Sequence, residues 1–432
     1  MDKIKKEQSY YTYIQQEYQV DAEIIAKMEE SIQACNHAFA EIQTIVELNQ
    51  LKVLRAFQNN QVTDFHLNGS TGYGYGDEGR DNLERVYADV FRAEKALVRS
   101  QLVSGTHALA VALFGNLKAG DELIAATGSP YDTLHKVIGI HGEEGSLIQK
   151  GIIYKEIALT AENKIDLERV LASITPQTKI VTFQRSKGYS WRPSFDIQQL
   201  AVAIRTIKKQ FPQVICMVDN CYGEFVEEKE PLEIGADLIA GSLIKNPGGG
   251  LALTGGYIAG KAALVDKAAI RLTAPGIGLD VGSSLNFSRH AYQGLFMAPL
   301  IVGEAIKGAV LAAKYFQTLN YPVFPEYNAK RTDIIQAIKV GSREMMIAFC
   351  RGIQQACPLD AHVRPEPALL PGYTDEVIMA GGTFIQGSSI ELSADGPIRP
   401  PYIIYLQGGL SFAHIKTGLI LAADEMRKKA KD

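Results

Sequence analysis

Between Ala96 and Ala259 the chain alternates short apolar runs with helical patterns, and this alternation limits the possible folds more than any other feature. Strands separated by helices of this length are typical of a mostly parallel sheet covered on both faces, so we predict an α/β fold. Ligands of such folds bind at the carboxyl ends of the strands. The predicted strands lie near Ala96–Val98, Glu122–Ala126, Ile152–Leu159, Lys179–Phe183, Val214–Val218, Leu238–Ala240 and Gly256–Ala259, and the helices near His107–Leu117, Tyr131–Gly139, Asp166–Ile174 and Phe195–Phe211.

The sequence divides into an N-terminal arm (1–60), a large domain (61–284), a long connecting helix (285–321) and a smaller α+β domain (322–432). Apolar residues recur at three- and four-residue steps from Ala22 to about Asn59, which predicts an amphipathic helix. Because the arm shows no core of its own, we expect it to lie on the main domain or on a second subunit. We expect another helix after Asp81, a good N-cap. In the smaller domain we predict helices near Arg343–Ala356 and Ser411–Arg427 and strands near Val377–Gln386 and Tyr402–Leu406.

Composition narrows the class of function. A hydrophobic content of 46% is that of an ordinary globular protein, and a net charge of −4 without a dense Lys/Arg block disfavours nucleic-acid binding. The five cysteines are scattered and lack CxxC spacing, so we expect neither a disulfide framework nor a metal site. The N-terminus has no apolar core of a signal peptide, and no stretch of about 18 uninterrupted apolar residues follows. We therefore expect a cytoplasmic protein, away from the membrane, that acts on a small molecule.

Lys245 lies between the apolar run that follows Asp237 and the glycine cluster Gly248–Gly250. This pattern predicts that a strand ends here and that the backbone turns tightly. Charged groups are rarely buried unless they are paired, neutralised or chemically used. A desolvated lysine amine attacks carbonyl groups, most commonly to form a Schiff base with a substrate or with pyridoxal phosphate. The alternative interpretation is an exposed lysine in a glycine-rich loop.

Two motifs at predicted strand ends favour the Schiff-base interpretation. Ser104-Gly105-Thr106 lies where a strand gives way to a helix, and the free N–H groups of such a turn bind anions, although an N-cap alone would also explain it. Asp219 directly follows the apolar run that ends at Val218. A metal site or a cap would explain the aspartate by itself. The aspartate, the lysine and the phosphate-type turn together match the groups that hold pyridoxal phosphate.

Three other groups of residues suggest a ligand more weakly. Tyr131 follows a predicted strand, where it either stacks on a planar ring or simply packs. Arg185 belongs to a segment with two further cations and the only tryptophan, which indicates either an anionic substrate or a solvated loop. Tyr73, Tyr75 and Arg80 lie among four glycines, in a segment that either binds a phosphate or carboxylate or is a flexible loop. No strand precedes these glycines, so we reject a dinucleotide-binding fingerprint.

The order of Ser104-Gly105-Thr106, Asp219 and Ser242-Leu-Ile-Lys245 along the chain resembles that of fold-type I pyridoxal-phosphate enzymes. The whole chain more closely resembles the bacterial methionine gamma-lyase/cystathionine beta-lyase-like family that is often called "aluminium resistance protein". The segments that carry this closer resemblance are Ser70–Arg80, Gln184–Pro193 and Lys245–Gly250. The resemblance implies a fold-type I pyridoxal-phosphate-dependent transferase-like fold, with the cofactor in the large domain.

The resemblance also implies roles for individual residues. Lys245 would form the Schiff base, Asp219 would pair with the pyridine nitrogen, and Tyr131 would stack on the ring. The phosphate would be held by Ser104, Gly105, Thr106 and Ser242. Tyr73, Tyr75 and Arg80 would reach the phosphate of a neighbouring subunit, and Arg399, with Arg185 as second choice, would bind the substrate carboxylate.

The function implied is that of a carbon-sulfur lyase acting on a small sulfur amino acid by β- or γ-elimination, in a homodimer or homotetramer. The cofactor residues are shared with aminotransferases, aldolases and decarboxylases, so another reaction on the same cofactor stays open. A protein that binds pyridoxal phosphate without turnover is a further alternative. The sequence offers no metal-ligand spacing that would explain an aluminium-resistance role.

Overall fold

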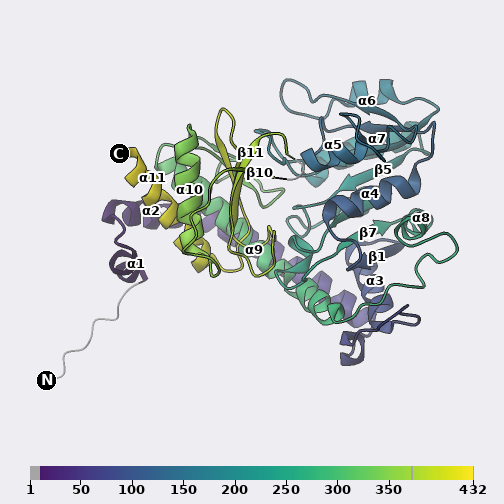
Figure 1. The fold of residues 1–432 in the computed structure, drawn as a ribbon, viewed down its shortest axis with the longest axis horizontal. Coiled ribbons are helices and arrows are strands. Elements are labelled where there is room, and N and C mark those ends of the chain that lie inside the picture. The colour runs from purple at the N-terminus through teal and green to yellow at the C-terminus, as the bar shows by residue number, and fades with distance from the viewer. Residues whose placement is uncertain (1–9, 371–372, 432) are drawn as a thin grey trace.

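The computed structural model describes residues 10–370 and 373–431, and these form a seven-stranded sheet and a six-stranded sheet with helices packed around both. Figure 1 shows the two sheets in separate halves of the molecule, with a long helix running between them. That helix is α9 (Phe287–Thr318). The structure therefore has the α/β architecture predicted from the alternation of strands and helices.

The large sheet has the strand order β1-β7-β6-β5-β4-β2-β3 and is mostly parallel, as predicted. Strand β7 is the exception, because it pairs antiparallel with both β1 and β6. Its strands lie within one or two residues of the predicted ranges, except that the strand predicted over Ile152–Leu159 ends at Glu156. The bounds are β1 Lys95–Arg99, β2 Glu122–Ala125, β3 Ile153–Glu156, β4 Thr178–Gln184, β5 Ile215–Asp219, β6 Leu238–Ser242 and β7 Gly256–Gly260.

Helices cover this sheet on both faces (Figure 1). Ser104 is the N-cap of α4, and its side chain accepts a hydrogen bond from the amide of His107. The helix expected after Asp81 begins earlier, at Glu78, because Asp77 caps it by accepting from the Arg80 amide. The helix α8 was not predicted. The bounds are α3 Glu78–Phe91, α4 Gly105–Asn116, α5 Asp132–Ile138, α6 Leu167–Ser173, α7 Ile197–Gln210, α8 Ala262–Leu272, η2 Pro231–Ile234 and η3 Asn246–Gly248.

The N-terminal arm is a short helix α1 (Tyr10–Tyr18) followed by α2 (Ala22–Asn59), which has the predicted bounds and packs along α9. Its first half contributes Ile24, Ile25 and Met28 to the core beneath the small sheet. Its second half contributes Val46 and Val53 to the core of the large domain. The arm therefore packs on both halves of its own chain, and a short helix η1 (Asp64–Leu67) follows it.

The small sheet is antiparallel throughout, in the order β10-β11-β12-β13-β9-β8. The strand predicted to end at Gln386 ends at Ala380, and β8, β9, β10 and β12 were not predicted. Helices α10 (Arg343–Ala356) and α11 (Phe412–Lys431) pack against each other beside this sheet. The strands are β8 Val323–Phe324, β9 Gln336–Lys339, β10 Ala368–Leu369, β11 Glu376–Ala380, β12 Ser393–Pro397 and β13 Ile403–Gln407.

Helix α9 is long and apolar enough to cross a membrane, and it is the one candidate for a membrane span in the described part of the chain. However, 72% of its most hydrophobic 18-residue window is buried inside the protein. It packs against α2, α11 and η3, and residues along its length belong to both major cores. Its apolar character is therefore that of a core helix that joins the two halves.

Candidate active site

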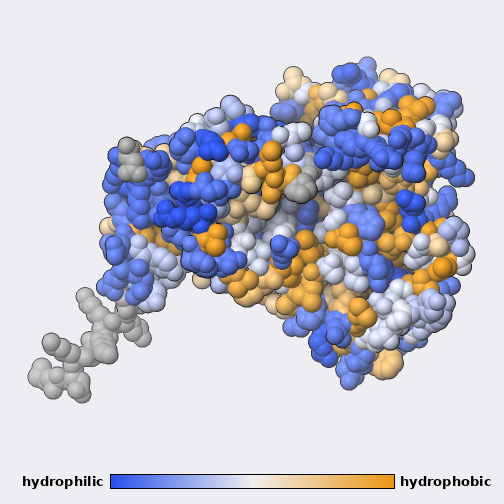
Figure 2. Space-filling view, viewed as in Figure 1, coloured by the Kyte–Doolittle hydropathy of each residue, from blue (hydrophilic) through white to orange (hydrophobic). Residues whose placement is uncertain are grey.

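A cavity of about 380 Å³ lies at the carboxyl ends of β4, β5 and β6, where the large sheet faces the small one. Figure 2 shows a recess in the surface between the two halves of the molecule. Both sheets line the cavity, because Gln184, Asp219 and Ser242 end strands of the large sheet and Asp395 and Gln407 lie on β12 and β13. The location is the edge at which ligands of parallel α/β sheets bind.

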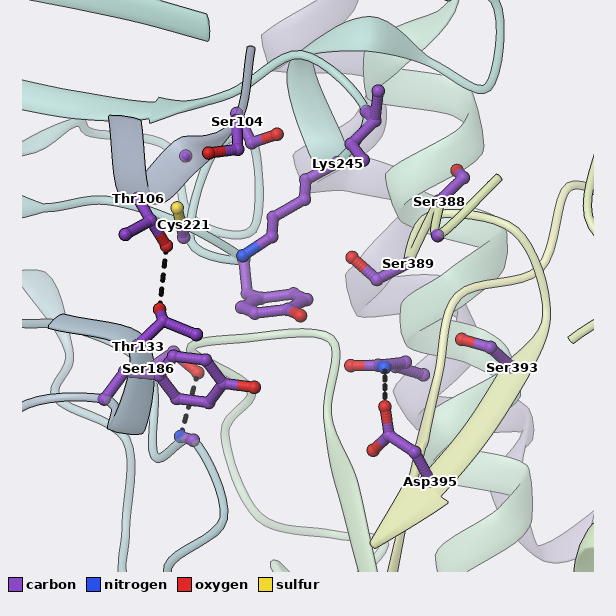
Figure 3. A pocket seen from close by; sticks show the side chains of 18 of the residues that line it. Ser104, Thr106, Thr133, Ser186, Cys221, Lys245, Ser388, Ser389, Ser393 and Asp395 are labelled. Atoms are coloured by element: carbon purple, nitrogen blue, oxygen red, sulfur yellow. Dashed lines mark hydrogen bonds between the residues drawn. The ribbon is translucent and has the colours of Figure 1, made fainter. Parts of the chain in front are cut away.

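Lys245 lies three residues after β6, and its side chain extends into the cavity (Figure 3). Its Nζ lies 4.0 Å from the centre of the Tyr222 ring, a cation–π contact. Burial lowers the pKa of Lys245, but the acidic groups of Cys221, Tyr222, Asp219 and Glu224 outweigh it and raise that pKa above its ordinary value. The lysine therefore enters the cavity as an ammonium group surrounded by acids.

Tyr222 itself has a backbone φ of 70°, which non-glycine residues with bulky side chains rarely adopt. A residue held in this region costs about 1–3 kcal/mol, and such residues cluster at functional sites. The ring is held under the Lys245 amine by this turn directly after β5. Local strain and the position of the lysine therefore belong to the same part of the cavity.

Asp219 is the last residue of β5, and its Oδ1 accepts a hydrogen bond of 3.1 Å from the Cys221 amide. Burial raises the pKa of Asp219, while the Lys245 ammonium and the Cys221 amide oppose this effect. Since β5 and β6 are parallel neighbours, the residues that follow them reach the same cavity. The structure thus brings the predicted aspartate and lysine together.

The N-terminus of α4 forms a third part of the cavity, with Ser104, Gly105 and Thr106 in its lining. Its first amide groups have no partner within the helix, which favours an anion. A Cβ on Gly105 would lie 3.2 Å from Ser242 Cβ and 3.3 Å from Cys221 Sγ, so glycine allows this close approach. The turn, Ser242 and the end of β5 therefore meet at one place, as the sequence predicted.

Tyrosine side chains cover another side of the cavity. The hydroxyl groups of Tyr131 and Tyr373 lie 2.8 Å apart, and the Tyr189 ring lies 5.7 Å from that of Tyr131. Burial raises the pKa of Tyr131 and Tyr189 well above the usual tyrosine value. Both are neutral donors at ordinary pH, and the predicted Tyr131 thus lies in the same cavity as Lys245.

The small sheet supplies polar side chains that the sequence analysis did not single out. Asp395 Oδ2 accepts a hydrogen bond of 3.2 Å from Gln407 Nε2. Burial raises the pKa of Asp395 to about 7, although Tyr189, Gln407 and the Lys245 charge oppose this effect. Ser388 and Ser393 also line the cavity and are buried (Figure 3). This side of the cavity is rich in hydroxyl, amide and carboxyl groups.

The structure does not bring the two predicted carboxylate-binding arginines into the cavity lining. Arg399 lies between β12 and β13, where Nη1 pairs with Asp375 Oδ2 at 2.6 Å on the surface. Arg185 is fully buried, and it pairs with Glu227 at 2.9 Å and Glu230 at 3.5 Å. Both guanidinium groups therefore have carboxylate partners outside the cavity.

The loop of Tyr73–Arg80 also lies outside the cavity lining. Tyr73 and Tyr75 are 73% and 70% exposed, and their rings stack with centroids 5.4 Å apart. Arg80 is buried beneath them and donates to the carbonyl groups of Gly74 and Gly282 at 2.8 and 3.1 Å. The arginine holds the loop in shape, while the two tyrosines face outward.

Comparison with known proteins assigns the family. The family model described as "Methionine gamma-lyase" matches residues 24–427. The chain belongs to the methionine gamma-lyase family. The uncharacterized protein YnbB of Bacillus subtilis is 53% identical over 90% of this chain and 93% of its own length.

Solved structures of similar proteins agree with this membership. A carbon-sulfur lyase involved in aluminum resistance from Clostridium novyi is 47% identical, with a TM-score of 0.92 over 95% of this chain and 98% of the other. A proposed cystathionine beta-lyase involved in aluminum resistance from Clostridium acetobutylicum is 48% identical, with a TM-score of 0.93 over 96% and 99%. The predicted family resemblance is confirmed.

In this member of the methionine gamma-lyase family, the sequence analysis missed polar cavity residues that lie on strands of the small sheet. Asp395 and Ser393 lie on β12, whose sequence Ser-Ala-Asp-Gly-Pro lacks the apolar alternation that predicts a strand. Gln407 ends a strand that was predicted to stop one residue earlier. A signal was present in the two-residue spacing of Ser393 and Asp395, which places both on one face of a strand. It becomes informative only once the strand is known.

Proposed function

We propose that this protein is a pyridoxal-phosphate-dependent carbon-sulfur lyase that removes a sulfur group from an amino acid by β- or γ-elimination. The observation that carries the proposal is that Lys245, Asp219 and the N-terminus of α4 line one cavity. Membership of the methionine gamma-lyase family supports the reaction class.

The residues of the cavity fit pyridoxal phosphate. Lys245 Nζ would hold its carbonyl carbon, and the free amides of α4 with Ser104, Thr106 and Ser242 would hold its phosphate. Asp219, whose pKa burial raises, gains a partner if a protonated ring nitrogen lies beside it. Gly105 leaves room where a side chain would touch Ser242 and Cys221. When bound, the cofactor supplies an electron sink next to the substrate Cα.

The side chains around this position would carry the proton transfers. The Lys245 amine would take the proton from the substrate Cα, and the neighbouring acids that raise its pKa would hold the resulting ammonium. Tyr131 would cover the ring face, and its hydroxyl is kept neutral by burial. The two sheets on either side of the cavity would limit the access of water.

We propose that the protein works as a homodimer or homotetramer, with the exposed Tyr73 and Tyr75 reaching the site of a second subunit. Large apolar side chains are also exposed on α2 and α9, and Figure 2 shows hydrophobic side chains gathered where α9 lies. These are Leu48, Leu51, Leu54, Phe296 and Leu300, which are 39–56% exposed.

The five cysteines are all free and buried, which suits the reducing cytoplasm.

The test begins with the absorbance spectrum of the purified protein and continues with a screen of sulfur amino acids. Release of ammonia together with pyruvate or 2-oxobutyrate would support elimination. A colourless protein that gains no cofactor on incubation with pyridoxal phosphate would refute the cofactor. Transfer of the amino group from an amino acid to a keto acid, without release of ammonia, would instead show an aminotransferase.

A further inference from the structure

The small-sheet side of the cavity contains a carboxyl group without a cationic partner. Asp395 is 7% exposed, and its Oδ2 accepts from Gln407 Nε2 at 3.2 Å. Its Oδ1 is buried and forms no hydrogen bond of ordinary geometry with the described residues, although the Tyr189 hydroxyl lies close enough to the carboxyl group to lower its pKa. No ion pair of Asp395 occurs in the described part of the chain, so the carboxyl group lacks a compensating cation there.

The Asp395 carboxyl group is unusual because the one basic side chain of the described cavity lining has other acidic groups beside it. Among the described residues of the lining, Lys245 is the one basic side chain, and it faces Asp219 and Tyr222. A buried carboxylate without a partner is costly, so it either holds a proton or meets a cation. The pKa of Asp395 of about 7 agrees with a group that changes between these two conditions near neutral pH.

Other acceptors and hydroxyl groups of the cavity also lack partners. Ser393 lies two residues before Asp395 on β12 and is paired in register with Gln407, so the three side chains share one face of the sheet. Ser393 Oγ and Ser388 Oγ are buried without a hydrogen-bond partner among the described residues. Gln184 Oε1, from the large sheet, is likewise unpaired, while the Nε2 of the same amide donates to the Ser186 carbonyl. A ligand group with several N–H donors would satisfy this set.

We propose that Asp395, with Ser393 beside it, forms a subsite for a protonated amine at the distal end of the substrate side chain. The preferred substrates are then thioether amino acids whose side chain ends in an ammonium group, rather than a methyl thioether. This inference rests on the proposed lyase function. An ammonium group donates to Asp395 Oδ1, which is a buried acceptor, and it neutralises the carboxylate.

Two substrates of equal size test the subsite. S-(2-aminoethyl)-L-cysteine and S-propyl-L-cysteine have the same number of non-hydrogen atoms and differ by an ammonium in place of a methyl group. The holoenzyme is expected to favour the aminoethyl compound in kcat/KM by at least about tenfold, the value of a hydrogen bond to a charged group. Asp395→Asn should abolish this preference. Asp375→Asn, which changes a carboxylate of the exposed Arg399 pair, should keep it.

A second pair of compounds tests binding without elimination. L-lysine and L-2-aminoheptanoate carry the same distal groups and have no sulfur to eliminate, and calorimetry gives their Kd values. The wild-type protein should bind L-lysine at least about tenfold more tightly, and Asp395→Asn should remove the difference. Ser393→Ala, a milder change, should reduce the preference about threefold and serves if Asp395→Asn does not fold.

The outcomes separate the subsite from the reaction. Equal kcat/KM values for the two sulfur compounds and equal Kd values for the lysine pair in the wild type would refute the proposed subsite. Equal losses on both members in Asp395→Asn would overturn it too, because they would place Asp395 against the α-amino group that the pair shares. Failure of every sulfur compound to release ammonia would refute the lyase, while the lysine pair would still decide the subsite.

Discussion

The two sides of the cavity differ in how their polar groups are paired. On the large-sheet side, the Lys245 ammonium has the Tyr222 ring and the Asp219 carboxyl group near it, and Asp219 accepts from the Cys221 amide. On the small-sheet side, Asp395 Oδ1 and the Ser393 hydroxyl form no hydrogen bond of ordinary geometry with the described residues. The lysine of the first side therefore has acidic groups beside it, whereas the carboxyl group of the second forms no ion pair in the described part of the chain.

This difference suggests a division of labour. Groups that hold a cofactor and move a proton at Cα are needed for every substrate, and they occupy strand ends of the rigid parallel sheet. Groups that select one side chain from another are carried by the small sheet, whose unpaired atoms discriminate between ligands by their donors. Mutations on the large-sheet side should therefore lower activity on every substrate, whereas mutations on the small-sheet side should lower activity on particular substrates.

The largest effect is expected from Lys245→Ala. Without the amine, the protein should lack the absorbance at ~420 nm of pyridoxal phosphate joined to a lysine. Elimination from every sulfur amino acid should fall by about 10²–10⁴-fold, because the base at Cα is lost. Absorbance spectra and ammonia release measure both. Lys164→Ala, at an exposed position before α6, is the matched control. A band that persists in Lys245→Ala would mean that another lysine holds the cofactor.

Asp219→Asn should have the next largest effect. The variant should keep bound cofactor, while exchange of the substrate Cα hydrogen with deuterium in heavy water slows by about 10–100-fold, since one charge-assisted hydrogen bond is lost. Nuclear magnetic resonance of the substrate measures this rate. Asp375→Asn controls for the change from carboxylate to amide on the surface. An unchanged exchange rate would remove Asp219 from the electron-accepting machinery.

The same contrast explains what could be predicted from sequence. Lys245, Asp219 and the turn at Ser104 follow apolar runs, and the ends of parallel strands meet at one edge, so strand order along the chain was enough to bring them together. The helix predicted from Ala22 to about Asn59 is present over Ala22–Asn59, because its apolar residues recur at three- and four-residue steps. These features depend on local patterns and one topological rule.

The small-sheet side could not be predicted in this way. Asp395 points inward from a strand whose five residues are all buried but mostly small or polar, so hydrophobic periodicity gives no signal. Arg185 shows the opposite problem, because its cluster of cations suggests an anionic ligand, yet Glu227 and Glu230 fold back to pair with it. Pairings between residues distant in sequence decide which charges remain free for a ligand.

Replacing Tyr73 and Tyr75 together with alanine tests whether the large-sheet side is completed by a second subunit. Exposed stacked aromatics at an interface contribute about 2 kcal/mol or more, so subunit dissociation should become about 30-fold easier. Light scattering over a range of concentrations measures this change. Tyr13→Ala, at a 53% exposed tyrosine of α1, is the control. A wild-type protein that is monomeric at its working concentration would contradict the shared site.

Arg399→Ala should have the smallest effect. Arg399 forms a 2.6 Å ion pair with Asp375 on the surface of the small domain, and exposed pairs of this kind contribute about 0–1 kcal/mol. Both kcat and KM should therefore stay within about fivefold of the wild type for the aminoethyl and propyl substrates alike. Steady-state kinetics with the two compounds measures this. The matched variant Asp375→Asn removes the other half of the same ion pair.

A tenfold rise in KM for both substrates in Arg399→Ala, with Asp375→Asn unchanged, would contradict this expectation. The guanidinium would then leave Asp375 and bind the α-carboxylate that all the substrates share. The small sheet would in that case hold one group for every substrate and another, Asp395, for selected ones. The same kinetic assay measures both effects. Loss of Arg399 would then change KM for both compounds, whereas loss of Asp395 would change kcat/KM for the aminoethyl compound alone, so the two roles can be distinguished.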